Sequence, residues 1–424
     1  MRKFFKTIIY ITLTTISVTS VAQETTFLTY KEYMTRVKNA NISYLAEKYN
    51  VDIAEAKMQA AKIMPDPELS IGYGNNQDWD LQMGYNIDAG LSYTLELGGK
   101  RGARMGVARS EKELAEVLLE DYFRNLRADA TIAYLSAVKQ RHLNQLQKSS
   151  YREMYKLAQA DSLRFKAGTI MEVDARQSKL EAQSMRNEIY AYESDLKETL
   201  LNLLMLQGIN TLQLPDSIQG SLLLPKQDFD LAKLISLAQN NRTDIQMAIK
   251  TQEMSQNNLR LAKANRCIDL GLSIGGSYSS EVRNELAPAP AFKGIVAGIS
   301  VPLKFSNINN GELKAAQLSV SQSKMQYEAI ELQIRTEVAQ AYSRYISALR
   351  QIEQFDNGLL SEAEYIFKKK VYSYERGESN MIELLNAKRT YYDNQIAYQE
   401  SLFNFSVALI ELERACGVWD IEIE

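Results

Sequence analysis

Apolar residues recur every three or four positions over long stretches of both halves of the chain, the pattern of helices that pack along one face. Proline is absent from residues 68–214 and 303–424, so most of both stretches can be helical. The pattern predicts long helices over 102–165, 172–206, 311–374 and 381–415, with breaks at Gly168 and Gly377. The first helix would be about 95 Å long. Helices of this length must lie side by side in a bundle, rod or cylinder.

Strict alternation of apolar and polar residues separates these helical stretches. The alternation covers 17 positions in residues 81–97, within a strand-forming region at about 67–97, and a similar region runs over 269–305. One face of each strand would be apolar or aromatic and the other rich in Gly, Ser, Asn and Thr, as a transmembrane β-barrel requires. A soluble sandwich strand gives the same alternation. The length of residues 81–97 and the leader described below favour the membrane barrel.

The chain is internally duplicated. Gly168 recurs as Gly377 and Gly208 as Gly417, both 209 positions later, so 40 positions separate the two glycines in each half. The helix and strand patterns recur in the same order. We therefore predict a first repeat over 23–220 and a second repeat over 221–424.

Two strand pairs per chain are too few to close a barrel. An open sheet in lipid would leave unpaired N–H and C=O groups at its edges, and known barrels begin at about eight strands. If the strands lie in a membrane, several copies must share one barrel. The strand count thus predicts an obligate homo-oligomer.

The N-terminus carries the features of an export signal. Arg2, Lys3 and Lys6 precede an apolar run over residues 8–18, and small residues lead up to Ala22. This run is too short to span a bilayer as a helix. We predict a cleaved signal peptide over residues 1–22.

Composition removes several function classes. The chain has 49 basic and 52 acidic residues, which gives a net charge of −3 and no basic surplus for a nucleic-acid partner. Its one histidine, His142, falls in a polar run and is expected at the surface. We therefore expect no enzymatic activity, catalytic residue, metal site or cofactor. Cys267 and Cys416 either form a disulfide or remain two separate thiols.

These features together resemble the TolC-type family of outer-membrane efflux proteins. The resemblance rests on the leader, the duplicated plan, Tyr374-Glu375-Arg376-Gly377 followed by residues 382–387, and Asn241-Arg242-Thr243-Asp244-Ile245. It implies a mainly α fold with membrane β-structure: a homotrimer with a shared 12-stranded barrel in outer-membrane lipid and a long α-helical barrel in the periplasm. It also implies a periplasmic adaptor and an inner-membrane efflux pump as partners, with drugs or metal ions as cargo.

The resemblance places the turns at Gly168 and Gly377 at the periplasmic tip. Phe165 and Tyr374, beside these turns, become candidates for adaptor contact together with the two glycines. Asp174 and Glu383, each six positions after a turn glycine, become candidates for a carboxylate ring in the lumen. The alternative for both carboxylates is a first-turn acid stabilised by the helix N-terminus. Related members carry a basic gate residue where this chain has Ser379 and a second carboxylate where it has Asn386, so the gate of the best-known members is not expected here.

Two other functions share parts of this pattern. An outer-membrane duct for protein secretion would have the same fold and a different cargo. A periplasmic coiled-coil adaptor or spacer would share the signal peptide and long helices but lack the aligned alternating strands.

Overall fold

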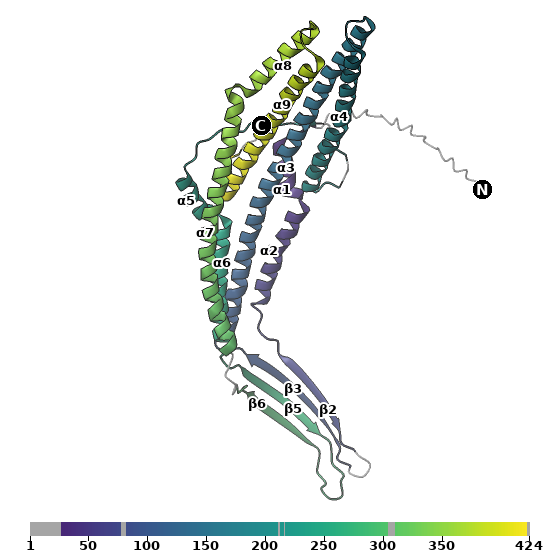
Figure 1. Ribbon diagram of the computed structural model, residues 1–424. Coiled ribbons are helices and arrows are strands. Elements are labelled where there is room, and N and C mark those ends of the chain that lie inside the picture. The colour runs from purple at the N-terminus through teal and green to yellow at the C-terminus, as the bar shows by residue number, and fades with distance from the viewer. Residues whose placement is uncertain (1–26, 78–81, 211–212, 216, 304–309, 422–424) are drawn as a thin grey trace, which may run out of the picture.

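The computed structural model of the protein describes residues 27–77, 82–210, 213–215, 217–303 and 310–421. The signal peptide predicted over 1–22 lies outside the described residues. Long helices form a rod that ends in two hairpin turns, and a four-stranded sheet extends from the opposite end (Figure 1). Within the described residues, no helix combines the length and the apolar character needed to cross a bilayer.

The first repeat contributes an unbroken helix and its antiparallel partner. Helix α3 (Lys100–Lys166) has 67 residues, and α4 (Glu172–Leu206) returns along it. Each buries a seam of small and aliphatic side chains. The shorter helices α1 (Tyr30–Ala40) and α2 (Ile42–Ala60) precede them, and α2 packs beside α3 (Figure 1).

The second repeat has the same order of elements but a broken long helix. Helices α5 (Leu231–Asn241) and α6 (Thr243–Ala264) precede α7 (Asn310–Gln354), a π-helical turn η1 (Phe355–Leu359), α8 (Leu360–Glu375) and α9 (Met381–Cys416). The single helix predicted over 311–374 is therefore wrong. Gly358 adopts φ 108°, which lies outside the helical range and which glycine tolerates better than other residues do. The chain changes direction there, between α7 and α8 (Figure 1).

The four long strands form one antiparallel sheet in the order β2-β3-β5-β6. They are β2 (Glu68–Asn75), β3 (Tyr85–Leu95), β5 (Leu270–Ser279) and β6 (Phe292–Ser300). The 17-residue strand expected over 81–97 is shorter, with 11 residues, because Gln82 and Gly84 turn the backbone with positive φ before Tyr85. Gly98 and Gly99 do the same at the other end. Leu81 and residues 304–305 lie outside the described residues.

The strand register brings most apolar residues of the four strands onto one face. Leu91 pairs with Leu69 on one side and Ile274 on the other, and Ile274 pairs with Ala297. Many of these side chains are open to the surroundings of the single chain, with Ile295 87% and Ile71 74% exposed. The opposite face carries Ser70, Gly90 and Gly275 in one row, which ends at Val296 on β6. The predicted contrast between an apolar and a small or polar face is present on β2, β3 and β5, whereas β6 also places Val296 and Phe292 on the second face.

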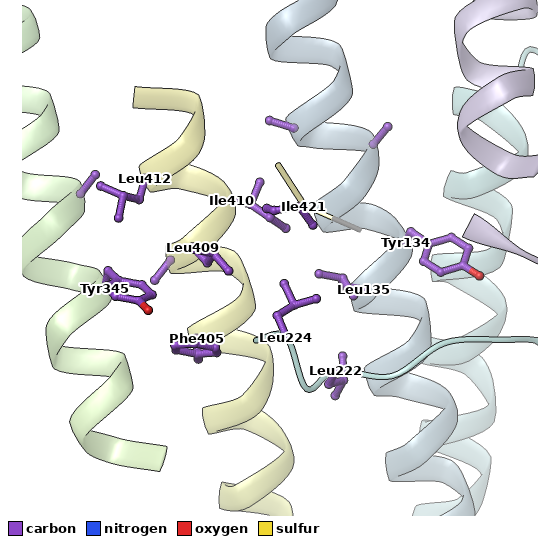
Figure 2. Close-up of a cluster of buried hydrophobic side chains, with 14 of the residues drawn as sticks. Tyr134, Leu135, Leu222, Leu224, Tyr345, Phe405, Leu409, Ile410, Leu412 and Ile421 are labelled. Atoms are coloured by element: carbon purple, nitrogen blue, oxygen red, sulfur yellow. The ribbon is translucent and has the colours of Figure 1, made fainter. Parts of the chain in front are cut away.

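The main core lies at the middle of the rod, where the repeats meet. The linker between the repeats runs between α3 and α9 and buries Leu222 and Leu224 there (Figure 2). A buried tyrosine of each repeat anchors this linker: Tyr134 donates to the carbonyls of Leu28 and Gln219, and Tyr345 donates to the carbonyl of Gln227 at 2.6 Å. The short parallel pair β1 (Phe27–Leu28) and β4 (Ser217–Ile218) completes the region.

The junctions between the short helices hold the ends of the returning long helices. Asn41, between α1 and α2, donates from Nδ2 to the Leu206 carbonyl at 2.9 Å. Arg242, between α5 and α6, donates from Nη1 to the Ala415 carbonyl at 3.4 Å. The packing is close, since a Cβ on Gly208 would lie 2.0 Å from the Ala40 carbonyl oxygen. In both repeats a side chain at the junction of the two short helices thus donates to a carbonyl at the end of the returning long helix, although the side chains differ.

One expectation about a single residue needs correction, and the two alternatives for the cysteines are resolved. His142 is half-buried, because its ring nitrogens contact Arg141 at 2.8 Å and Gln399 at 3.2 Å. Burial and the Arg141 charge lower the pKa of His142, so the ring is neutral at pH 7. Cys416 is a buried thiol in the main core and forms no disulfide with Cys267, which lies beside Gly98 at the sheet end of the rod.

Candidate functional site

The candidate site is the pair of hairpin tips at the end of the rod opposite the sheet (Figure 1). We call residues 161–178, at the α3–α4 turn, the first tip, and residues 370–383, at the α8–α9 turn, the second tip. Both contain the residues singled out in the sequence.

The two turns have the same backbone structure. Gly168 has φ 73° and Gly377 has φ 76°, and each ends its helix in the left-handed conformation. The next residue in each case donates back into the helix: Thr169 N to the Arg164 carbonyl at 3.0 Å, and Glu378 N to the Ser373 carbonyl at 2.9 Å. A Cβ on either glycine would meet nothing within 4 Å, so backbone conformation alone requires glycine.

Phe165 and Tyr374 occupy equivalent positions but have different surroundings. Phe165 is 41% exposed, whereas Tyr374 is 6% exposed and packs with Met381 and Leu384. Tyr374 therefore makes its contacts inside the chain. The exposed apolar surface of the first tip comes from Phe165 with Leu163, Met171 and Val173.

A residue that the sequence did not single out, Asp161, joins the tips. Its Oδ1 accepts a hydrogen bond of 3.1 Å from the Tyr374 hydroxyl, which reaches it from the other repeat. Asp161 is fully buried, and its Oδ2 has no hydrogen-bond partner. Burial raises the pKa of Asp161, while hydrogen bonding and the Arg164 charge act in the opposite direction and Asp174 adds to the rise.

Arg164 supports the same junction between α3 and α8. Its Nη1 lies 3.8 Å from Asp161 Oδ1, its Nη2 donates to the Glu375 carbonyl at 3.0 Å, and its guanidinium lies 5.7 Å from the centre of the Tyr374 ring. The contact between the tips thus combines one buried hydrogen bond with a cation that bridges two helices.

Glu383 is held inside the second tip. Its Oε2 forms a salt bridge of 2.6 Å with Lys370 Nζ, so α8 is tied to the start of α9. Its backbone N–H donates to the Asn380 side chain at 2.8 Å, which caps α9. Glu383 is therefore both a first-turn acid and half of a salt bridge.

Asp174 has no such partner. It is half-buried in the first turn of α4, where the preceding Met171 provides no side-chain cap. Within the described part of the chain, no basic group comes within 4.0 Å of its carboxylate. Instead, its charge acts on Asp161 and Tyr374 and raises the pKa of both. The structure thus places the two carboxylate candidates in different electrostatic surroundings.

The arrangement suits conformational change and protein contact. Among the described residues, no group of three or more His, Cys, Asp or Glu side chains could hold a metal ion. Helix α8 buries only Ala363 and Tyr374. Its position therefore depends mainly on its contact with α9 and on the hydrogen bond to Asp161.

Comparison with known proteins identifies relatives along nearly the whole chain. The family model of the outer membrane efflux proteins matches residues 36–208 and 234–418, one segment in each repeat. The cobalt-zinc-cadmium resistance protein CzcC of Cupriavidus metallidurans is 23% identical over 391 residues, which cover 92% of this chain and 90% of CzcC.

Solved structures share the fold. A membrane protein from Pseudomonas aeruginosa superposes with a TM-score of 0.73 at 19% identity, covering 91% of this chain and 93% of the other. CusC superposes with a TM-score of 0.75 at 18% identity, covering 92% of each chain. These superpositions confirm the predicted internally duplicated, TolC-like fold. Since the family model covers most of both repeats, the chain belongs to the outer membrane efflux protein family.

Proposed function

We propose that this efflux channel is a homotrimeric, passive exit duct that spans the outer membrane and reaches through the periplasm. The observation that supports this most strongly is the exposed apolar face of the four-stranded sheet. Edge strands β2 and β6 each pair on one side only, and Ile71 on β2 and Ile299 on β6 are 74% and 72% exposed. Pooled sheets from three chains would close these edges and turn the apolar face toward lipid.

The long helices would form the periplasmic part of the duct. An α-helix of 67 residues, the length of α3, extends about 100 Å, a length suited to crossing a compartment and not to enclosing a compact core. The hairpin tips would lie at the periplasmic entrance, held closed by the Asp161–Tyr374 contact. A periplasmic adaptor would engage the exposed tip around Phe165, Gly168 and Gly377 and hold the entrance open. The energy for transport would come from an inner-membrane pump.

The apolar sheet face argues against a periplasmic spacer, because soluble proteins rarely expose so large an apolar surface to water. A duct for protein secretion would share the whole fold. We favour small cargo, and metal ions first, because the relative CzcC is a cobalt-zinc-cadmium resistance protein and is similar along 92% of this chain.

Planar-bilayer recording tests the channel function. The mature protein should insert in detergent-free bilayers and give discrete, ion-conducting events of low open probability. Failure to produce any conductance, with protein recovered in the bilayer fraction, would rule out a duct. Loss of the gene should separately increase the sensitivity of the host to cobalt, zinc or cadmium, whereas unchanged metal tolerance with impaired secretion of a protein would favour the secretion duct.

A further inference from the structure

The two tips carry different charges at positions that the duplication makes equivalent. Lys370 and Glu383 form a 2.6 Å salt bridge across the second hairpin. The residues 209 positions earlier are Asp161 and Asp174. Where the second tip has a cation and an anion, the first tip has two carboxylates.

Asp161, the buried carboxylate of the first tip, has hydrogen-bond partners for only one of its two oxygens. Asp161 Oδ1 accepts from Tyr374, but Oδ2 has no hydrogen-bond partner. The Ser178 hydroxyl, which also faces Asp161, donates 3.2 Å away to the Ala175 carbonyl. A buried, ionised carboxylate with one unpaired oxygen is costly unless it is neutralised.

A proton is the ligand that fits this site. Two carboxylates and two hydroxyls surround it, and the described residues offer no third acidic, histidine or cysteine ligand for a metal. A proton on Oδ2 would make Asp161 a donor to Ser178 Oγ, whose lone pairs can accept. Oδ1 would keep its bond from Tyr374.

We propose that Asp161, with Asp174 beside it, is a proton-binding site that controls the contact between the two hairpin tips. With the proton bound, Asp161 is neutral and the tips stay joined through Tyr374. Without it, two like charges face each other in the first tip and the end of α8 is released. The consequence for transport depends on the proposed closure of the duct at the tips; the proton site itself does not.

The direction of the pH dependence follows from the groups that face Asp161. Arg164 on α3 favours the charged form, whereas burial and Asp174 on α4 favour the neutral form, and the pKa of Asp161 in the joined state is raised. The joined tips therefore hold the proton more tightly than the separated tips do. Their contact is stable at low pH and weakens as the pH rises above the ordinary aspartate range through the raised pKa of Asp161.

Hydrogen exchange of the backbone amides at the C-terminal end of α8 tests the proposal in the intact, detergent-solubilised protein. After correction for the intrinsic pH dependence of exchange, protection of residues 367–375 should fall by up to about tenfold for each unit that the pH rises between the ordinary aspartate pKa and the raised pKa of Asp161, and should level off above the raised pKa. Asp161→Asn, which is neutral at every pH, should abolish this dependence. Asp174→Asn should shift it to lower pH. Glu172→Gln, which breaks the exposed pair with Arg176 in the first tip, is the matched control and should leave it in place.

The outcomes separate the proton site from the proposed function. Protection that is independent of pH, or that changes equally in wild type and Asp161→Asn, would overturn the proton site. A pH dependence of protection that Asp161→Asn removes, together with a conductance that does not follow it, would support the proton site and contradict closure of the duct at the tips.

Discussion

Tyr374 donates a hydrogen bond of 3.1 Å to the buried carboxylate of Asp161, although 213 positions separate them in the sequence. Each residue belongs to a different repeat, so this bond is a direct link between the two hairpins at their tips. The neighbouring Arg164 reinforces it through the Glu375 carbonyl.

Replacing Tyr374 with phenylalanine should favour the open channel. A hydrogen bond between neutral groups contributes about 0.5–1.5 kcal/mol, and the substitution leaves Asp161 buried with no donor from α8. We expect a higher open probability in planar bilayers. The matched control is Tyr372→Phe, because Tyr372 is 50% exposed in the same helix. Equal gating of Tyr374→Phe and wild type would show that the bond does not hold the channel closed.

Asp174 and Glu383 should differ in their effect on ion selectivity. Lys370 neutralises Glu383, whereas Asp174 has no salt bridge within the described residues. If both line the entrance, Asp174→Asn should reduce the cation preference more than Glu383→Gln does. The measurement is the reversal potential in a potassium chloride gradient. Unchanged selectivity in both variants would leave only their role at the helix N-termini.

The break in the second long helix should depend on one glycine. Gly358 has φ 108°, and a Cβ there would find its nearest neighbour at 3.5 Å, so a side chain fits but the backbone does not favour it. Gly358→Ala should destabilise the protein by about 1–2 kcal/mol, measured as a lower thermal midpoint in detergent. Gly311→Ala, at the start of α7, lacks this constraint and should leave the midpoint the same or higher. A neutral Gly358→Ala would mean that the turn η1 forms without the glycine.

Arg242 should contribute strongly to stability at the middle of the rod. It is 6% exposed and forms ion pairs with Asp244 and, at 2.5 Å, with Glu337 on α7. Arg242→Met leaves Glu337 without its cation and Asp244 with Arg124 alone, and should cost about 1.5–3 kcal/mol, seen in chemical denaturation. Arg176→Met, which breaks the exposed pair with Glu172, should cost less than about 1 kcal/mol. Similar losses for the two variants would contradict the importance of burial.

The sequence predicted the features that depend on local pattern. The spacing of apolar residues identified the long helices, and Gly168 and Gly377 marked turns because left-handed backbone favours glycine. Alternation identified the apolar sheet face, since neighbours such as Leu91 and Ile274 come from strands with the same periodicity. These elements needed no knowledge of distant contacts.

Features that depend on tertiary contacts could not be predicted in this way. Asp161 falls within a helical pattern like any polar residue, and only its contact with Tyr374 makes it unusual. The break at Gly358, in contrast, had a local signal that the helical pattern around it outweighed, because the dipeptide Asn357-Gly358 is typical of turns. His142 lies in a polar run, yet its contact with Gln399 on α9 buries it. The salt bridge that distinguishes Glu383 from Asp174 likewise depends on Lys370, 13 positions away.

The proposed sharing of one barrel is the claim on which the duct depends. Native mass spectrometry of the mature protein, extracted from the outer membrane in detergent, tests it most directly. A shared barrel predicts a complex of three chains that does not dissociate on dilution. A monomer that stays soluble without detergent would contradict it.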